Sequence, residues 1–453
     1  MNKINPSQTI LFSYLILIII GTFALLLPIC NNTKISFIDA LFTATSALTV
    51  TGLIVKDTPN DFTFIGQLVI MFLIQIGGLG YMTLITFFII VFRGETSIRD
   101  QLILSEALNY KGLSGIIRFL RQVIIIVFFC EFLGLLFLFI YFFYENNDVN
   151  KSLYYSLFHS ISAFNNAGFS LFSDNLMRYK SSLYINIVIS ILIFVGGIGY
   201  YVIMDIFLFM KTNYFSKNNS KSYNRISVHS KAVLLTSLLL ILIGTLGILF
   251  FEIGNYNGIW KFSLYEKILV SLFSSISSRT AGFNTIDFST LSDSTIYLII
   301  LLMFIGASPG GTGGGIKTIT FLIIFMSVIN YIKGSEKVVF MKREINNKTI
   351  LKSMLILSLA FVFNFIITLL IAKVENQDFL NILFEVISAS STVGLSIGSS
   401  NGLSLVYEFS SVGKILIIIS MIIGKIGILS FAIAVSSKNY TSRVEYPDSR
   451  LIL

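Results

Sequence analysis

The sequence predicts an all-α, polytopic membrane protein in which four helix–pore-helix–helix repeats surround a central pore in a pseudo-fourfold arrangement. The first observation behind this prediction is the composition. Of the 453 residues, 55% are hydrophobic and only 12% are charged, whereas soluble domains carry about 25% charged residues. The second is a short apolar run, rich in Ser and Thr and ending near a glycine, which recurs four times at intervals of about 115 residues. Apolar runs of about 20 residues, long enough to cross a bilayer, flank each copy.

The four copies of this run have similar sequences, and each begins with Phe. They read FTATSALTVTGL, FHSISAFNNAGF, FSSISSRTAGF and FEVISASSTVGL. The glycines near their ends are Gly52, Gly168, Gly282 and Gly394. A near-constant interval indicates copies of one structural element. We therefore divide the chain into unit 1 (1–92), unit 2 (93–211), unit 3 (212–331) and unit 4 (332–453).

Each unit is predicted to contain a spanning helix, a short re-entrant helix, a loop and a returning helix. The first helices are expected at Ile10–Cys30, Phe119–Tyr144, Ala232–Phe251 and Ile350–Ala372. The short helices are expected at Phe37–Leu48, Leu153–Phe164, Leu264–Ser278 and Phe379–Ser390. The return helices are expected at Phe64–Phe92, Leu183–Met210, Ile296–Tyr331 and Val412–Val435. This pattern gives eight spanning and four re-entrant segments.

Basic residues predict how the chain is oriented in the cell membrane. Lys and Arg concentrate in the links between units and at the C-terminus, with no acid between Lys211 and Lys231. Acids and amides such as Asp57 and Glu145 gather in the connections on the other side. Because short cytoplasmic loops carry the excess of Lys and Arg, we expect both termini to be cytoplasmic. Much of the net charge of +9 follows this asymmetry, which favours a membrane protein over a nucleic-acid-binding one.

The four loops that contain the glycines, here called the glycine loops, have the composition of an ion filter. Non-helical backbone at membrane depth is tolerated only beside protein or a water-filled path. Four such loops around one axis can replace the water around an alkali cation with carbonyl oxygens. The loops contain no Asp or Glu, so the sequence does not indicate a site for a divalent cation. Neighbouring Thr and Asn residues can brace the loops. The predicted filter residues are Val50, Thr51, Gly52, Asn166, Ala167, Gly168, Thr280, Ala281, Gly282, Thr392, Val393 and Gly394.

The return segment of unit 3 contains a glycine-rich stretch that predicts a gate. A continuous helix is not expected there, because each Gly costs about 1 kcal/mol and Pro about 3 kcal/mol relative to Ala. The spacing does not match a phosphate-binding loop, since Ile316 separates Gly315 from Lys317. We expect a flexible loop below the filter, rather than a packing kink. Its residues are Gly306, Ser308, Pro309, Gly310, Gly311, Thr312, Gly313, Gly314, Gly315 and Lys317, here called the 306–317 loop.

Two charged residues lie within apolar segments. Lys425, in the return segment of unit 4, is predicted to project into the pore and form an electrostatic barrier; the alternative is a lysine paired within the bundle. Glu131, in the first helix of unit 2, is expected to make a structural hydrogen bond. The shorter glycine-rich stretches of the other return segments are expected to allow close helix approach.

Three motifs give the chain a family resemblance. TAGFNT at Thr280–Thr285, NAGF at Asn166–Phe169 and GASPGGTGGGIKT at Gly306–Thr318 resemble the Trk/Ktr/HKT superfamily of potassium transporters, and within it the Ktr-type membrane subunit. The resemblance covers essentially the whole chain. Lys425 departs from the Arg that members of the family commonly carry at this point.

The resemblance implies potassium uptake through a pore in each subunit of a homodimer. It also implies a separate cytosolic ring of RCK-type, nucleotide-binding subunits that controls the gate. Potassium is then the substrate, a role for sodium stays open, and no organic cofactor is expected in this chain. The basic cytoplasmic links could dock the ring or anionic membrane lipid.

Other functions are weaker alternatives. A sodium-preferring or poorly selective transporter would share the same architecture, because selectivity depends on filter geometry. A proton-coupled transporter would need a titratable carboxylate on the path, for which Glu131 is the best candidate. An enzyme is not expected, because His159 and His229 are isolated from metal-ligand or nucleophile motifs. Cys30 and Cys130 predict no disulfide framework and no transition-metal site.

Overall fold

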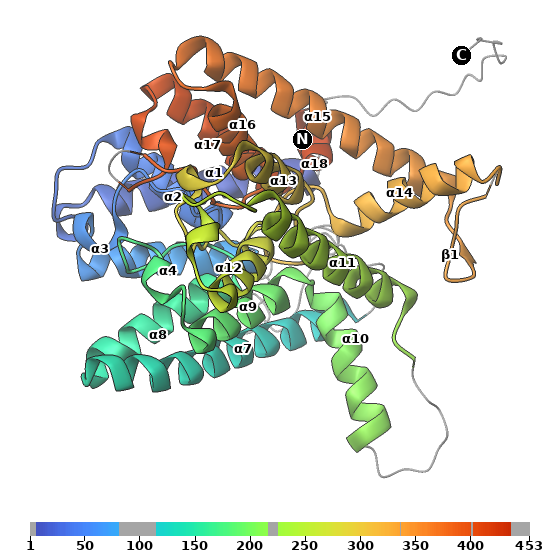
Figure 1. The fold of residues 1–453 in the computed structure, drawn as a ribbon, viewed down its shortest axis with the longest axis horizontal. Coiled ribbons are helices and arrows are strands. Elements are labelled where there is room, and N and C mark those ends of the chain that lie inside the picture. The colour runs from blue at the N-terminus through green and yellow to red at the C-terminus, as the bar shows by residue number, and fades with distance from the viewer. Residues whose placement is uncertain (1–5, 81–114, 216–224, 336, 400–401, 436–453) are drawn as a thin grey trace, which may run out of the picture.

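Helices make up almost all of the regular structure in the computed structural model, which describes residues 6–80, 115–215, 225–335, 337–399 and 402–435 (Figure 1). Several predicted features lie outside these ranges. They are the second half of the first return helix, most of the link between units 1 and 2, part of the link between units 2 and 3, and the C-terminal tail.

The first helix of each unit is long and apolar, close to the predicted bounds. These helices are α1 (Pro6–Leu26), α7 (Ile116–Asn146), α11 (Val228–Phe251) and α15 (Asn347–Val374). Each contains a stretch of at least 19 residues that is long and apolar enough to cross a membrane. About one third or less of each such stretch is buried within the chain. The exposed apolar surface is therefore available to lipid.

The second helix of each unit is short and surrounded by protein. These helices are α2 (Phe37–Thr49), α8 (Val149–Phe164), α12 (Leu264–Ser277) and α16 (Phe379–Ser390). Their starts agree with capping chemistry: Ser36 accepts a hydrogen bond from the Asp39 amide, and Ser263 forms a capping box with Glu266. Their C-terminal halves are almost entirely buried, although they are rich in Ser and Thr.

The return segments of units 2, 3 and 4 are broken, and the sequence predicted intact helices in units 2 and 4; the first return segment is described only as far as Gly80. They consist of α4 (Phe64–Leu79), α9 (Leu183–Gly197) with α10 (Tyr200–Met210), α13 (Asp293–Phe304) with α14 (Thr318–Ile332), and α17 (Ser411–Ile426) with α18 (Ile428–Val435). The α9–α10 pair is bent by 102° and the α17–α18 pair by 101°. The prediction of continuous helices at Leu183–Met210 and Val412–Val435 is therefore wrong.

Glycines in left-handed backbone conformations explain the two bends. Gly199 has φ 94° and Gly427 has φ 89°, values that a residue with a Cβ rarely adopts. The described residues thus contain four helices long enough to span a membrane, or six if each bent pair counts as one span. In unit 3 the break falls where the sequence predicted it, between Phe304 and Thr318.

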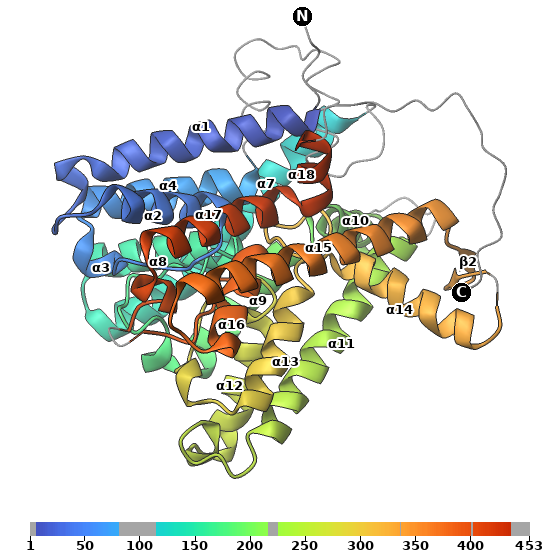
Figure 2. The same cartoon turned by 90° about the horizontal axis from the view of Figure 1, so that it is seen from above.

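Short elements connect these helices. They are η1 (Pro28–Cys30), α3 (Thr58–Asp61), η2 (Met177–Tyr179), the π-helical turn η3 (Lys211–Phe215), η4 (Ile259–Lys261), η5 (Phe288–Thr290), η6 (Leu405–Glu408), and the antiparallel strands β1 (Val339–Phe340) and β2 (Arg343–Glu344). The β1–β2 hairpin lies at the far end of α14, away from the short helices (Figures 1 and 2).

The helices pack in a closed cycle of neighbouring units. The return segment of each unit packs on the short helix of the next: α4 on α8, α9 on α12, α13 on α16, and α17 on α2. The first and last helices also meet, since α1 packs on α18 and the Gln8 amide donates a hydrogen bond to the Ala434 carbonyl at 3.0 Å. Figure 2 shows α1 and α18 side by side at this closure. The cycle brings the four glycine loops together.

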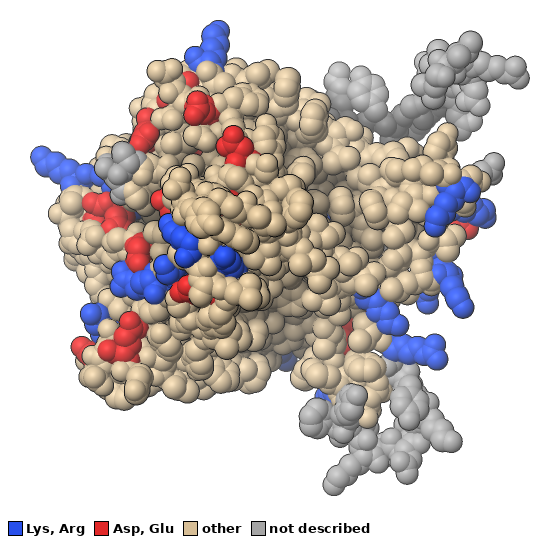
Figure 3. All heavy atoms as spheres, viewed as in Figure 1, with Lys and Arg blue, Asp and Glu red and all other residues tan. Residues whose placement is uncertain are grey.

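Charged side chains differ between the two ends of the molecule. Acidic groups gather on the side that carries α3 and the loops after the short helices, together with several Lys or Arg side chains (Figure 3). The end with α14 and the β hairpin carries mainly Lys and Arg, including Lys333, Lys342 and Arg343 (Figure 3).

Candidate functional site

The four predicted filter glycines lie in a closed ring. A Cβ placed on Gly52 would lie 3.2 Å from the Cα of Gly168, and one on Gly168 would lie 2.9 Å from the Cα of Gly282. A Cβ on Gly282 would lie 3.2 Å from the Cα of Gly394, and one on Gly394 would lie 2.9 Å from the Cα of Gly52. Residues far apart in the sequence therefore meet backbone to backbone, in the order of the units.

The residue directly before each glycine points its carbonyl oxygen at the glycine of a neighbouring loop. The Ala167 oxygen lies against Gly52, the Ala281 oxygen against Gly168, the Val393 oxygen against Gly282 and the Thr51 oxygen against Gly394. A side chain on any of the four glycines would overlap the carbonyl oxygen of the next loop. Glycine is thus required here both for space and for backbone angle, since all four have φ between 70° and 95°.

The four loops also share an unusual conformation two residues before each glycine. Val50, Asn166, Thr280 and Thr392 have φ of 57°, 59°, 78° and 49°. Positive φ is a strained choice for a β-branched residue, and it recurs here in three of the four loops. The same backbone path is therefore built four times from different side chains. All four residues are fully buried.

A serine in each short helix holds the loop that follows it. Ser46, Ser162, Ser277 and Ser388 donate hydrogen bonds to the carbonyls of Leu53, Phe169, Phe283 and Leu395 over 2.5 to 2.8 Å. In units 1 and 4 the same hydroxyl also accepts the amide of the loop glycine, Gly52 or Gly394, at 3.0 and 3.1 Å. We call these four residues the brace serines. The sequence prediction assigned the bracing to Thr and Asn and missed them.

The predicted Thr and Asn residues make further contacts, both within and between the loops. The hydroxyl of Thr51 pairs with that of Thr49 at 2.7 Å. The Asn166 side-chain amide lies 3.3 Å from the Thr280 hydroxyl of the next glycine loop. With its oxygen and nitrogen exchanged, the amide nitrogen instead lies 3.1 Å from the carbonyls of Ala163 and Ile193. Thr392 accepts a hydrogen bond from the Gly314 amide at 2.8 Å, so it holds the 306–317 loop. The brace serines could have been found in the aligned repeats, where each lies five or six residues before the glycine.

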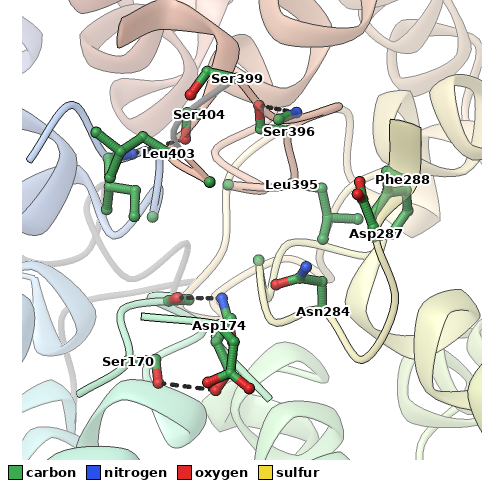
Figure 4. A pocket seen from close by; sticks show the side chains of 18 of the residues that line it. Ser170, Asp174, Asn284, Asp287, Phe288, Leu395, Ser396, Ser399, Leu403 and Ser404 are labelled. Carbon is green, nitrogen blue, oxygen red and sulfur yellow. Dashed lines mark hydrogen bonds between the residues drawn. The ribbon is translucent and has the colours of Figure 1, made fainter. Parts of the chain in front are cut away.

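A cavity of about 450 Å³ opens directly on the glycine ring (Figure 4). All four glycines line it, together with residues that follow them in the loops, such as Ser170, Asn284 and Ser396. Residues that precede the glycines do not line it. The ring therefore separates this cavity from the part of the molecule that contains the 306–317 loop.

Each unit contributes one acid to the wall of this cavity. The four acids are Asp57, Asp174, Asp287 and Glu408. Asp174 forms a bidentate pair with Arg178, at 2.6 and 2.8 Å, and its hydrogen bonds raise the pKa of that guanidinium. Asp57 instead accepts from Ser173 and Asn60, which carry no charge. The cavity wall is thus net acidic, which favours cations over anions.

The 306–317 loop lies against the opposite side of the ring. A Cβ on Gly313 would overlap the Thr280 hydroxyl, and one on Gly314 would lie 2.6 Å from that of Thr392. Backbone hydrogen bonds join the loop to the α9–α10 bend: Ser308 N to Gly197 O at 3.0 Å, and Tyr200 N to Gly310 O at 3.1 Å. The loop therefore contacts units 2 and 4 as well as its own unit.

Two lysines, one in this loop and one in unit 4, bind its carbonyl groups. The Lys425 ammonium donates to the Thr312 oxygen at 2.6 Å. The Lys317 ammonium donates to the Gly313 oxygen at 2.7 Å. Lys425 thus lies at the loop that was predicted to be the gate, and it joins unit 4 to unit 3.

The remaining titratable candidates lie elsewhere. Glu131 is buried and accepts hydrogen bonds from Gln75 at 3.1 Å and Asn165 at 2.8 Å. It does not line the cavity above the ring. The described parts of the chain hold no cluster of three His, Cys, Asp or Glu that could bind a metal, and Cys30 and Cys130 are free thiols.

Comparison with known proteins matches this architecture to one family over nearly the whole chain. The profile of the TrkH family, described as cation transport proteins, matches residues 3–443. The chain is 38% identical to Ktr system potassium uptake protein B of Bacillus subtilis, over 99% of this chain and 97% of the relative. It is 33% identical to the potassium/sodium uptake protein NtpJ of Enterococcus hirae, over 100% of this chain and 98% of the relative.

The fold also matches a solved structure. The crystal structure of the potassium transporter TrkH from Vibrio parahaemolyticus superposes with a TM-score of 0.73 at 19% sequence identity, covering 96% of this chain and 86% of that one. At this identity the match shows a shared fold. Together with the profile match and the full-length relatives, it shows that the chain belongs to the TrkH family of cation transport proteins, which are membrane transporters and not enzymes.

Proposed function

We propose that this chain carries potassium into the cell through a channel-like pore, with the four glycine loops as its selectivity filter. The observation that carries this proposal is the closed ring of Gly52, Gly168, Gly282 and Gly394, in which each preceding carbonyl faces the next loop. Such a ring presents backbone oxygens around one axis. Carbonyl oxygens can replace the hydration shell of an alkali cation. The predicted fourfold arrangement of repeats around a pore is part of this proposal.

Three further observations support conduction through the ring. The cavity opens on one side of the glycines and the 306–317 loop lies on the other, so the ring lies between an entrance and a barrier. The acids of the cavity wall raise the local cation concentration. The brace serines fix each loop to its short helix, which preorganises the oxygens.

Potassium is the favoured substrate because full-length relatives are named as potassium uptake proteins. A sodium-preferring or poorly selective transporter is the second candidate, and the relative named for potassium and sodium uptake favours it. A proton-coupled mechanism through Glu131 has less support. Both bonds of its carboxylate go to neighbouring amides, away from the cavity.

The 306–317 loop is proposed as the gate, and Lys425 is proposed to hold this gate closed. The loop lies under two filter loops and is held by the Lys425 ammonium and the Thr392 hydroxyl. Release of these contacts would free the space below the ring. Loop motions of this kind are an established way to open and close a binding path.

The proposal also includes the orientation of the chain in the membrane and its protein partners. The end with α14 and the β hairpin, rich in Lys and Arg, would face the cytoplasm, and the acidic cavity would face outward. The cytoplasmic end would dock a nucleotide-binding RCK ring that controls the gate, and the chain would form a homodimer. The words "Ktr system" in the names of the relatives agree with a membrane subunit that works with other components.

The test is cation uptake into liposomes that contain the purified chain, driven by an inside-negative potential. Potassium, rubidium and sodium are compared, with protein-free liposomes as the control. We expect potassium and rubidium flux well above sodium flux. Equal sodium and potassium flux would support the second candidate. If flux stayed at the protein-free level with and without the cytosolic ring, the transport proposal would be wrong.

A further inference from the structure

A second cavity, of about 140 Å³, lies beside the outer cavity at the boundary between units 2 and 3. Lys180, in the connection before α9, and Lys261, in the connection before α12, both line it. Met177 and Asp287 line both cavities, whereas the four glycines of the ring line only the outer one. This second cavity, here called the lysine cavity, is therefore separate from the proposed path of the cation.

The two lysines share one aromatic ring. The Lys180 ammonium lies 4.3 Å from the centre of the Phe262 ring, and the Lys261 ammonium lies 5.4 Å from it. Lys180 belongs to unit 2 and Phe262 to unit 3, so this contact joins the two units. A cation over the face of an aromatic ring is attracted by the quadrupole of the ring. The ring therefore positions both ammonium groups but leaves their charge without a counter-charge.

The charges around the lysine cavity are not balanced. Neither Lys180 nor Lys261 forms an ion pair with a residue that the structure describes, and the Lys261 ammonium donates to the uncharged Asn257 carbonyl at 2.9 Å. Two acids of the same region, Glu266 and Asp287, accept hydrogen bonds from serines instead. Two ammonium groups and one carboxylate, that of Asp287, line the cavity. Its net charge therefore favours an anion.

The apolar surface next to the cavity indicates which kind of anion fits. Lys180 lies three residues before Leu183, the first residue of α9, and Lys261 lies three residues before Leu264, the first residue of α12. These two helices pack on each other, and Leu183 and Leu264 are 49% and 73% exposed. Both lysines thus lie just where a lipid-facing apolar surface ends, which is the depth of phospholipid headgroups.

Aromatic side chains of the connection before α12, and of its first turn, agree with this depth. Tyr256 and Tyr265 are 70% and 49% exposed. A third lysine, Lys267, lies 3.7 Å from the centre of the Trp260 ring. Tyr and Trp, which have an apolar body and a polar tip, are typical of the boundary between a membrane and water. A lipid headgroup would meet these surroundings, whereas an anion free in solution would not need them.

We propose that the lysine cavity binds the phosphate group of an anionic phospholipid at the boundary between units 2 and 3. The Lys180 and Lys261 ammonium groups donate charge-assisted hydrogen bonds to the phosphate oxygens. Thr285 also lines the cavity, and its buried hydroxyl, which has no partner among the described residues, donates to the phosphate directly or through a water. The acyl chains lie along the exposed apolar surface of α9 and α12. In the orientation proposed above, this lipid belongs to the outer leaflet.

The test measures the rise in Tm of the purified chain in detergent when a short-chain phosphatidylglycerol is added. The readout is the lipid concentration that gives half of this rise. Phosphatidylcholine with the same chains keeps the phosphate but has no net charge, and sodium phosphate supplies the phosphate without chains. The variants are the double variant Lys180→Gln with Lys261→Gln, and Lys180→Arg. The matched control is Lys151→Gln, because that lysine also lies over a ring, at 5.6 Å from the centre of Tyr155, but does not line the lysine cavity.

We expect phosphatidylglycerol to reach half of its effect at a concentration about tenfold or more below that of phosphatidylcholine, because only the first has a net charge. The double variant should raise this concentration by about tenfold or more, as expected for the loss of charge-assisted hydrogen bonds. Lys180→Arg, which keeps the charge, should stay within about threefold of wild type, and Lys151→Gln should not differ from it. Without lipid, all variants should have a Tm close to that of wild type, because surface substitutions change stability little.

Several outcomes would overturn the proposal. They are equal effects of the two lipids on wild type, an unchanged response to phosphatidylglycerol in the double variant, and a loss in Lys151→Gln as large as that in the double variant. Sodium phosphate that gives the same lysine-dependent rise at a lower concentration than phosphatidylglycerol would show a site for free phosphate and overturn the lipid. None of these measurements involves transport, so a chain that binds the lipid but carries no potassium would contradict the proposed function alone.

Discussion

Ser388 illustrates how a single side chain holds one of the glycine loops. Its hydroxyl donates to the Leu395 carbonyl at 2.6 Å and accepts the Gly394 amide at 3.1 Å. Ser46 makes the same two contacts in unit 1. Removing such a hydroxyl leaves a buried carbonyl and a buried amide without their partner, at a cost of about 1–3 kcal/mol for each unsatisfied group.

We therefore expect Ser388→Ala to lower both stability and selectivity. The free energy of unfolding should fall by about 2–6 kcal/mol, since two groups lose their partner, and the ratio of potassium to sodium uptake should fall because the loop oxygens are less well fixed. Ser156→Ala is the matched control, since that buried hydroxyl bonds only to the Ser152 carbonyl of its own helix. Equal ratios in wild type and Ser388→Ala would argue against the bracing role.

Lys425 is a second single residue that holds a loop, here the 306–317 loop that we propose as the gate. Its ammonium holds the Thr312 carbonyl at 2.6 Å, and a hydrogen bond from a charged group contributes about 1.5–3 kcal/mol. We expect Lys425→Ala to raise potassium flux without a partner ring by about tenfold or more. Lys425→Arg, which keeps the charge, should stay near wild type. Flux that is unchanged or lower in folded Lys425→Ala protein would contradict the proposal that Lys425 holds the gate closed.

Some of the site residues could be predicted from the sequence alone, and others could not. The four glycines could be predicted because they recur at a regular interval within similar runs. The brace serines recur as regularly, but Ser is frequent throughout these runs and its partner carbonyl lies across a turn. Among the acids of the cavity wall, Asp57 and Asp287 each lie five residues after their glycine and Asp174 lies six residues after its own, so this spacing could have been noticed, but Glu408 lies fourteen residues after Gly394. Their convergence on one cavity depends on loop paths that no local pattern specifies.

At the scale of elements, the first helices and the short helices agree with the sequence prediction within a few residues. Long apolar runs and capping residues define them. The return segments of units 2 and 4 do not agree, because the apolar runs Leu183–Met210 and Val412–Val435 predict continuous helices. The α9–α10 bend depends on a long-range contact, in which the Tyr200 amide donates to the Gly310 carbonyl. Nothing within the run around Gly199 indicates that a loop from unit 3 fills this bend.

The 306–317 loop can be tested as an element. Deleting Gly311–Gly314 removes the Gly314 amide that donates to Thr392 and the Gly313 carbonyl that accepts from Lys317. We expect this deletion to raise potassium flux in liposomes without the ring partner. Thr392→Val should raise flux to a smaller extent, because it removes one contact and keeps the loop.

The loop deletion needs a check on folding. The deleted protein should elute from size-exclusion chromatography as wild type does. Flux at or below the wild-type level in such protein would rule out the loop as a barrier. A selective rise in sodium flux alone would indicate that the deletion damages the filter, which lies in contact with Gly313 and Gly314.

At the scale of the whole molecule, four units close into a cycle, and every unit supplies the same parts. The closure of α17 on α2 and of α1 on α18 completes it. The cycle places one glycine, one brace serine and one cavity acid from each unit around the same opening. This arrangement could be anticipated from four repeats in one chain, whereas the contacts between units could not.

The cavity acids act through the field of the whole molecule. We expect Asp57→Asn combined with Asp287→Asn to lower potassium uptake at low ionic strength, because the local cation concentration falls. The loss should shrink when choline chloride raises the ionic strength, since salt screens exposed charges. Asp293→Asn, outside the cavity wall, is the control. A loss that does not depend on salt would indicate a structural role instead.

The central claim is that four glycines form one filter, and the most direct measurement is the ratio of potassium to sodium permeability in four single Gly→Ser variants. Gly52, Gly168, Gly282 and Gly394 are each replaced, and the ratio is obtained from the reversal potential of liposome-reconstituted protein. The ring predicts that every substitution lowers the ratio, because each side chain would overlap the carbonyl of the next loop. A wild-type ratio in any folded variant would contradict a filter built from all four units.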